Sequence, residues 1–172
     1  CETPIDTAIH IEQNILKENV GCQDQIFAGH GGFIQIAFNS KTYDIKPIDA
    51  TGLESYLMLF FTGFQRTASE IVKTQLDTMS QHISEMKDIQ ILTRLAFNAI
   101  TDKQWLTVGS LLHESWEVKK QLSPLISNPP IDYIYQRAKD AGARGGKLCG
   151  AGGGGMMLLF VEPDFQDKVR EA

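Results

Sequence analysis

Glycine is concentrated in one stretch of this 172-residue sequence. Seven of the 15 glycines lie between residues 145 and 155, in the run Gly145-Gly146-Lys147-Leu148-Cys149-Gly150-Ala151-Gly152-Gly153-Gly154-Gly155. Glycine lets the backbone approach a ligand closely and direct several N–H groups at an anion. A turn that is merely flexible rarely leads directly into a buried strand, which the apolar residues 156–161 predict. We therefore favour a phosphate- or substrate-binding loop over a flexible or tightly packed turn.

Two common phosphate-binding motifs do not account for this run. Gly150, Gly152 and Gly155 satisfy the pattern GxGxxG, but a dinucleotide-binding loop follows a strand and opens a helix. The glycine run is expected to follow a helix and to open a strand. A Walker A loop requires Gly and Ser or Thr at the positions that Ala141 and Leu148 occupy.

Two acidic residues are associated with an earlier segment that also contains glycine. Asp24 lies within residues 21–32, whose four glycines predict a loop, and Glu12 lies twelve residues upstream on a predicted helix. An acid in a loop and an acid on the preceding helix can converge on one cleft. One of them can then bind Mg²⁺ while the other approaches a substrate hydroxyl. Taken singly, each acid is more typical of a solvated helix face or a turn.

Arg66 and Lys147 are the basic residues best placed to bind an anion. Arg66 follows the apolar run 57–61 and precedes Thr67-x-x-Glu70, a pattern typical of a helix start. Arginine suits bidentate binding of phosphate, and Lys147 lies within the glycine run. A solvated surface charge is the alternative interpretation for both residues.

The composition excludes several classes of protein. The four histidines lack metal-ligand spacing, and the three cysteines form no CxxC and no disulfide framework. With 42% hydrophobic and 22% charged residues the chain is globular, and a net charge of −5 argues against nucleic acid or an anionic membrane as partner. No apolar run approaches the ~20 residues that span a bilayer. We expect a cytoplasmic protein, because scattered cysteines suit a reducing compartment.

The predicted elements alternate irregularly. A helix begins after the N-cap Thr3 and ends near Asn19, and paired strands follow at 34–38 and 43–48. A strand buried on both faces is predicted at 57–61, then a helix with an apolar face formed by Ala68, Val72, Leu76, Met79, Ile83 and Met86. Further helices are predicted at 89–100, 103–122 and 131–141, followed by the glycine run, a strand at 156–161 and a final helix. This order predicts an α+β fold, with a change of domain between residues 49 and 54.

Three separated segments resemble motifs of the GHMP kinases, in the order that the family has them. They are Gly21-Cys22-Gln23-Asp24-Gln25, Gly31-Gly32-Phe33 and Lys147-Leu148-Cys149-Gly150-Ala151-Gly152-Gly153-Gly154-Gly155. The family includes galactokinase, homoserine kinase, mevalonate kinase and phosphomevalonate kinase. Within it, these segments and Phe61-Thr62-Gly63-Phe64-Gln65-Arg66-Thr67-Ala68-Ser69-Glu70 are most similar to the D-glycero-D-manno-heptose 7-phosphate kinase branch.

The resemblance implies roles for individual residues. Asp24 matches the acid that deprotonates or orients the acceptor hydroxyl, and Glu12 matches the helical acid that binds Mg²⁺ with the ATP phosphates. The loop that lines the substrate and nucleotide cleft comprises Gly150, Ala151, Gly152, Gly153, Gly154 and Gly155. The candidates for binding substrate are Gln23, Gln25, Arg66 and Lys147.

The implied reaction is transfer of the γ-phosphoryl group of ATP to the anomeric hydroxyl of D-glycero-D-manno-heptose 7-phosphate. The product would be the 1,7-bisphosphate, a precursor of lipopolysaccharide. A galactokinase-like or fucokinase-like sugar kinase is an alternative, since the same motifs serve several acceptors. A non-catalytic ferredoxin-like binding module is the alternative from another functional class.

The resemblance also divides the chain. It implies that residues 1–50 are the C-terminal part of a ribosomal-S5-like N-terminal domain, and that 51–172 are most of a ferredoxin-like C-terminal domain without its final strand. The family's nucleotide loop, of the type Pro-x-x-x-Gly-x-x-Ser-Ser, does not occur in this sequence. We therefore expect the chain to be an internal part of a longer kinase, and to be inactive by itself.

Overall fold

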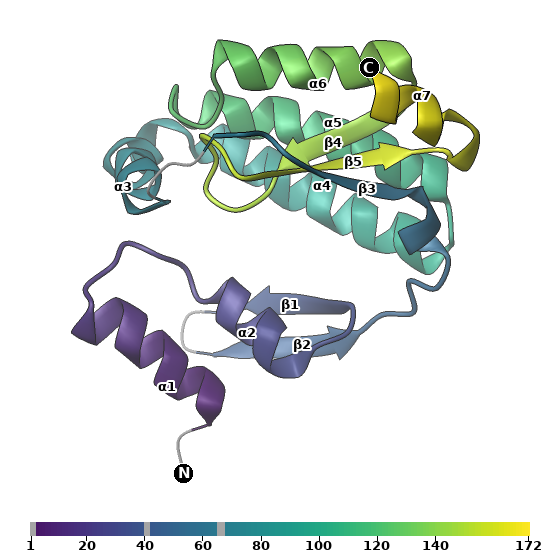
Figure 1. Cartoon of the computed structure of the whole chain (residues 1–172). Helices are drawn as coiled ribbons and strands as arrows, with labels where there is room; N and C mark the ends of the chain where they lie inside the picture. Colours follow the sequence, from purple (N-terminus) through teal and green to yellow (C-terminus); the bar gives the residue numbers. More distant parts are fainter. Residues whose placement is uncertain (1–2, 40–41, 65–67) are drawn as a thin grey trace. The chain divides into compact units, whose positions relative to one another are not determined.

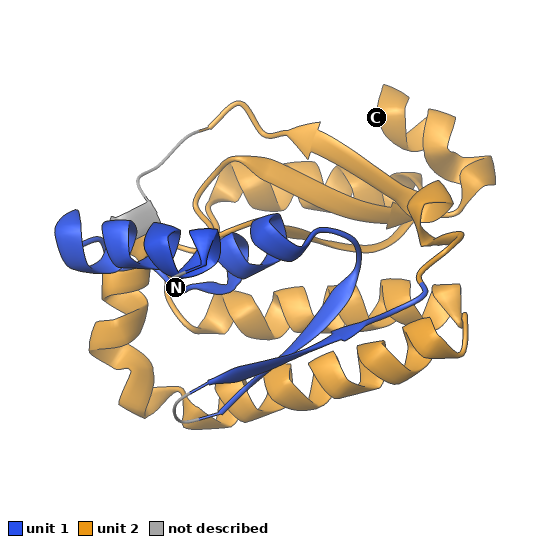
Figure 2. Cartoon of the chain, turned by 90° about the horizontal axis from the view of Figure 1, so that it is seen from below, with its two compact units in different colours: residues 1–49 blue, residues 50–172 orange. Residues whose placement is uncertain are grey.

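The chain forms two compact units in a computed structural model that describes residues 3–39, 42–64 and 68–172. Unit 1 comprises residues 1–49 and unit 2 comprises residues 50–172, coloured blue and orange in Figure 2. The identification of these units with particular kinase domains stays a prediction. None of the described helices has the length and apolar character needed to span a membrane.

Unit 1 begins with a capped helix, α1 (Pro4–His10). Thr3 and Asp6 form a reciprocal capping box, in which Thr3 Oγ1 accepts from Asp6 N at 3.2 Å and Thr3 N donates to Asp6 Oδ2 at 3.0 Å. This confirms the predicted start. The helix continues as a π-helical turn, Ile11–Ile15, and ends before Lys17, whose φ of 55° is left-handed. It is therefore shorter than predicted.

Residues 23–30 form a helix, so the prediction of a loop over residues 21–32 was wrong. This helix, α2 (Gln23–His30), is terminated by Gly31 and Gly32, both left-handed with φ of 66° and 68°. Gly29 lies inside the helix, where a Cβ atom would collide with the side chain of Ile5. The glycines thus end α2 and let it lie against α1, instead of preventing a helix.

A hairpin completes unit 1. Strands β1 (Ile34–Phe38) and β2 (Tyr43–Pro47) are antiparallel, with Ile34 opposite Pro47 and Phe38 opposite Tyr43. The alternation of apolar and polar residues therefore predicted both strands correctly. Within unit 1, Ile26 of α2 and Ile34 of β1 are buried.

Unit 2 is built on a three-stranded antiparallel sheet (Figure 1). Its strands are β3 (Leu57–Phe61), β4 (Ala143–Leu148) and β5 (Met156–Val161), in the order β3-β5-β4. The helices are α3 (Ala68–Thr78), α4 (Ile83–Thr101), α5 (Trp105–Gln121), α6 (Pro129–Ala141) and α7 (Gln166–Glu171). Short 3₁₀ turns occupy Leu53–Tyr56, Met79–Gln81 and Pro163–Phe165. Helices α5 and α6 both pack on β4, and α4 packs on α5.

Strand β3 lies at an edge of the sheet and has only one buried face. Met58 is 8% exposed, whereas Leu59 and Phe61 are each 57% exposed. The prediction of burial on both faces was therefore wrong, although the strand itself is confirmed. A continuous apolar run does not distinguish an edge strand from a central one.

The helix whose apolar face was predicted to run from Ala68 to Met86 is interrupted. A 3₁₀ turn at Met79–Gln81 separates α3 from α4. At the end of α3, Thr78 Oγ1 donates to Thr74 O at 2.9 Å, a back-bond that bends helices. The predicted apolar face is thus divided between two helices, and the predicted cap Thr67 lies outside the described residues.

The first part of the glycine run is a strand. Gly145 and Gly146 belong to β4, and only Cys149–Gly155 connects β4 to β5. The connection therefore follows a strand, not a helix as predicted, but it still opens a strand and so does not match a dinucleotide-binding loop. Glycine at position 145 is required because a Cβ atom would collide with Gly109 O of α5 and lie 2.9 Å from His113 N.

The core of unit 2 lies between the sheet and helices α5 and α6. Its largest fully buried side chains are Trp116, Phe160, Ile71, Ile126, Ile131, Leu148, Met157, Leu159 and Val161. Helix α6 begins where Asn128 Oδ1 accepts from Ile131 N at 3.1 Å, and two prolines follow this cap. The helix therefore begins two residues before residue 131, where it was predicted to start.

Candidate functional site

The loop between β4 and β5, residues 149–155, is held by side chains from other parts of unit 2. Four of its carbonyl oxygens accept such hydrogen bonds. The donors are Lys119 Nζ to Gly150 O (2.6 Å), Gln75 Nε2 to Ala151 O (3.4 Å), Asn128 Nδ2 to Gly153 O (3.4 Å) and Thr62 Oγ1 to Gly155 O (2.9 Å). We call residues 149–155 the glycine loop. This loop contacts α3, α5, the cap of α6 and the end of β3.

The second half of the glycine loop is packed closely against the rest of unit 2. Gly153 N donates to Ile126 O and Gly155 N donates to Phe64 O, both at 2.8 Å. Gly152 has a φ of 119°, and a Cβ atom there would lie 2.8 Å from Ile126 O. The loop is therefore a defined structure and not a flexible connection.

The anchored carbonyls determine where the next N–H groups point. The described residues contain no cis peptide bond, and in a trans peptide the C=O and the following N–H point in opposite directions. The carbonyls of Gly150, Ala151 and Gly153 point toward the anchoring side chains. The N–H groups of Ala151, Gly152 and Gly154 consequently point away from them. Gly152 and Gly154 are buried, whereas Ala151 is partly exposed, so among these three groups the N–H of Ala151 is the donor that the loop can offer to an anion.

Lysines of α5 add positive charge next to the glycine loop. Lys119 contacts Gly150 O directly, and the adjacent Lys120 pairs with Glu117 at 2.9 Å. Lys147, predicted to bind substrate from within the loop, lies on β4 opposite Leu158 and is partly buried. Arg66, the other predicted basic ligand, lies outside the described residues. Their roles in binding stay predictions.

In unit 1, Glu12 contacts Gln25. Glu12 lies in the π-helical turn after α1 and accepts a hydrogen bond from Gln25 Nε2 of α2. Both side chains are partly buried, whereas the neighbouring Asp24 and Gln23 are exposed in the first turn of α2. The exposed carboxylate of Asp24 can accept a hydrogen bond from a hydroxyl group. Two helices therefore hold Glu12 and Gln25 in contact across 13 positions of sequence.

The oxygen atoms at Glu12 suit a hard cation. Gln25 Oε1 is buried, and no hydrogen-bond partner for it is found among the described residues. A carboxylate and an amide oxygen are ligand types that Mg²⁺ accepts, and Mg²⁺ commonly takes only one or two carboxylates besides substrate phosphates. Across residues 3–39, 42–64 and 68–172, no group of three His, Cys, Asp or Glu could hold a metal alone. The pair thus fits Mg²⁺ that is shared with a phosphate.

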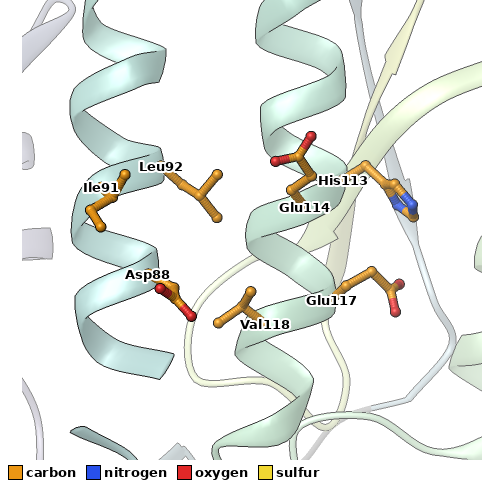
Figure 3. Close-up of a pocket in the computed structure, with 7 residues that line it drawn as sticks. All are labelled: Asp88, Ile91, Leu92, His113, Glu114, Glu117 and Val118. Atoms are coloured by element: carbon orange, nitrogen blue, oxygen red, sulfur yellow. The ribbon is translucent and has the colours of Figure 1, made fainter. Parts of the chain in front are cut away.

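A concave region lies between α4 and α5, apart from the glycine loop (Figure 3). It has a volume of about 400 Å³ and is lined by Asp88, Ile91, Leu92, His113, Glu114, Glu117 and Val118. Figure 3 shows Leu92 and Val118 between the two helices, while His113 and Glu117 lie on the far side of α5. Its three acids would repel a phosphate, so we do not place the reaction here.

His113 and Glu117 have structural partners in unit 2. His113 Nδ1 lies 2.8 Å from the hydroxyl of Tyr135, and Glu117 pairs with Lys120. Burial raises the pKa of Tyr135 above its usual range, and the charge of Glu117 acts in the same direction. Tyr135 therefore stays protonated and joins α6 to α5.

Three residues at the glycine loop were not singled out from the sequence. Lys119 and Gln75 lie 31 and 76 positions from the loop residues that they contact, so no local pattern indicates them. For Asn128 the sequence does give an indication, because Asn before two prolines is typical of the residue that caps a helix. That indication predicts its contact with the helix and not its contact with Gly153.

Comparison with known proteins relates the chain to kinases. A family model described as "GHMP kinases C terminal" matches residues 96–172. A D-glycero-alpha-D-manno-heptose 7-phosphate kinase of Campylobacter jejuni subsp. jejuni serotype O:2 is 33% identical over 168 residues, covering 91% of this chain and 48% of that protein.

Two solved structures extend the comparison. A D-glycero-D-manno-heptose 1-phosphate kinase from Bacteroides thetaiotaomicron is 26% identical with a TM-score of 0.65, over 96% of this chain and 46% of that one. The mevalonate kinase of L. major in complex with R-mevalonate has a TM-score of 0.73 at 22% identity, over 87% of this chain and 47% of that one. The predicted α+β kinase fold is thereby confirmed. The chain spans about half the length of each of these relatives.

Proposed function

We propose that the full-length protein is an ATP-dependent sugar kinase, since a family model of the GHMP kinase C-terminal domain matches residues 96–172. Its proposed acceptor is the anomeric hydroxyl of D-glycero-D-manno-heptose 7-phosphate. The observation that carries this choice is the 33% identity, over 91% of the chain, to a protein named as a heptose 7-phosphate kinase. In the full-length protein, unit 1 would belong to the N-terminal domain and unit 2 would be most of the C-terminal domain.

Asp24 is the proposed acid at the acceptor hydroxyl. It is exposed at the start of α2, so a sugar can reach its carboxylate. Phosphoryl transfer requires mainly positioning and neutralisation of charge, and a carboxylate that accepts the hydroxyl proton orients the attacking oxygen. We therefore expect direct transfer from ATP to the sugar, without a covalent enzyme intermediate.

Glu12 is the proposed ligand of Mg²⁺, together with Gln25. The support is the contact between the two side chains and the buried Gln25 Oε1, for which the described residues supply no hydrogen-bond partner. Bound Mg²⁺ supplies positive charge that neutralises the phosphate oxygens during transfer. Gln25 is thus assigned to the metal side of the site, which differs from its predicted contact with the sugar.

The glycine loop is proposed to bind anionic groups of ATP or of the sugar phosphate. The support is its geometry, because the N–H group of the partly exposed Ala151 points away from the side chain of Lys119 that anchors Gly150 O. Gln23, Lys147 and Arg66 are proposed to contact the sugar or its remote phosphate. Of these, Gln23 is exposed on α2 and Lys147 is partly buried on β4.

The acceptor is tested by ³¹P NMR of the full-length protein with Mg-ATP and one sugar at a time. The sugars are heptose 7-phosphate, galactose and fucose. A new anomeric phosphate signal with the heptose alone supports the proposal. Product with galactose or fucose instead would assign the protein to another sugar kinase. Binding of neither ATP nor any sugar would favour a non-catalytic binding module.

The role of Asp24 is tested by Asp24→Asn in the full-length protein. We expect kcat to fall by ~10²–10⁴, because the amide retains the shape of the side chain but does not accept a proton. Asp44→Asn is the matched control, since Asp44 is also an exposed acid of unit 1 but lies on β2. Unchanged turnover in Asp24→Asn would remove Asp24 from this role.

A further inference from the structure

Lys119 contacts the glycine loop where the loop begins. It lies in the last turn of α5, and its Nζ donates to Gly150 O at 2.6 Å. Gly150 is exposed and left-handed, with a φ of 69°, and apart from its chain neighbours none of the described residues has an atom within 4 Å of the position of a Cβ there. A charged donor therefore holds a carbonyl in the least enclosed part of the loop.

The two ends of the glycine loop are held differently. At its end, Gly155 O accepts from both Thr62 N and Thr62 Oγ1 at 2.9 Å, and Gly155 N donates to Phe64 O. At its beginning, the carbonyls of Gly150 and Ala151 accept from the ends of long side chains. Of these two contacts, the one from Lys119 is the shorter and is charge-assisted, which makes it the stronger.

We propose that Lys119 is a positioning residue for the glycine loop. Its bond to Gly150 O sets the orientation of the peptide unit that joins Gly150 to Ala151, and hence directs the N–H of Ala151 away from α5. This inference rests on the proposed function, in which that N–H group faces an anion during phosphoryl transfer. Lys119 acts through the backbone and needs no contact of its own with ATP or sugar.

Lys120 provides a matched control for this inference. It is the next residue of α5 and carries the same charge, but it pairs with Glu117 at 2.9 Å and lies 3.9 Å from Asp132. Neutralising Lys120 changes the charge of α5 by the same amount as neutralising Lys119. A difference between the two variants therefore reports on the contacts of Lys119, including the one with Gly150, and not on charge in general.

The experiment measures loop order and turnover in the full-length protein. Without ligand, ¹⁵N relaxation should give Ala151 an order parameter of about 0.85 in the wild type and below about 0.6 in Lys119→Met. With Mg-ATP and heptose 7-phosphate, kcat of Lys119→Met should fall about tenfold while KM for ATP changes less than about twofold. Lys119→Arg, which keeps a charged donor, should recover both values, and Lys120→Gln should match the wild type.

Three results would overturn this role. If Ala151 stays ordered in Lys119→Met, the proposed role fails, whether or not kcat changes. A mobile loop with unchanged kcat shows that the orientation of the Ala151 N–H has no effect on the reaction. A raised KM for ATP with an ordered loop indicates direct contact with the nucleotide. If the wild type transfers phosphate to no sugar, the proposed function fails, and the order parameters alone decide whether Lys119 positions the loop.

Discussion

Two segments of this chain are rich in glycine, and they use glycine for different physical reasons. In residues 21–32 of unit 1, the part of the chain that the structure describes places no atom, chain neighbours apart, within 4 Å of where a Cβ of Gly21, Gly31 or Gly32 would lie. Gly31 and Gly32 are left-handed and terminate α2. In this segment glycine mainly provides a backbone conformation that other residues rarely adopt.

In residues 145–155 of unit 2, the glycines of β4 provide space, whereas Gly150, Gly153 and Gly155 of the glycine loop are left-handed, as Gly31 and Gly32 are. A Cβ at Gly145 would collide with Gly109 O, and one at Gly146 would lie 2.5 Å from Leu158 O. Gly152 combines both reasons, since it is left-handed and would place a Cβ 2.8 Å from Ile126 O. The two segments are similarly rich in glycine, but glycines end a helix in unit 1 and allow close contact between backbones in unit 2.

Gly145→Ala should have the largest effect on stability. The new methyl group would force β4 away from α5, and we expect a loss of about 3 kcal/mol or more in the unfolding free energy of unit 2. Both tryptophans, Trp105 and Trp116, lie in unit 2, so their fluorescence during urea unfolding reports on this unit. A loss below about 1 kcal/mol would mean that the two backbones separate easily, and the contrast between the segments would fail.

Gly152→Ala should have an intermediate effect. It meets both a left-handed φ of 119° and the carbonyl of Ile126, but a loop can shift more readily than a strand under a helix. We expect a loss of roughly 1–3 kcal/mol by the same fluorescence measurement. An effect as large as that of Gly145→Ala would indicate that the loop is as rigid as the sheet.

Gly21→Ala should have the smallest effect, with the opposite sign. Gly21 lies outside the left-handed region and has open space around it, so alanine fits and reduces the entropy of the unfolded chain. We expect unit 1 to gain about 0.4–1 kcal/mol, measured by amide hydrogen exchange in α2 and the β1-β2 hairpin. A destabilised unit 1 would contradict the view that position 21 needs glycine neither for its conformation nor for space.

Prediction from sequence succeeded where side chains follow a period. The alternating residues of β1 and the apolar runs of β3 and β5 predicted strands that the structure contains. The periodic apolar residues predicted α5 and α6 to within two residues at each end. Hydrophobic periodicity reflects burial on one face, and burial is what forms these elements.

Prediction failed where glycine was the main signal. Residues 23–30 form α2 although the segment is rich in glycine, because these glycines lie at or beyond the ends of the helix or against Ile5. Strand β4 was missed because Gly145 and Gly146 leave it without an alternating pattern of apolar and polar residues. A glycine can lie in a turn or at a close contact between backbones, and the residues next to it in the sequence do not show which of the two it is. Only the packing partner does, and that partner is remote in sequence.

The sequence by itself determined the elements with periodic side chains, the α+β class and the resemblance to GHMP kinases. All three can be recognised from short segments of sequence and from the order in which those segments follow one another. The tertiary structure decided that Glu12 contacts Gln25 and that Lys119, Gln75 and Asn128 hold the glycine loop. These contacts join positions 13 to 76 residues apart, so they arise only when packing brings separate elements together.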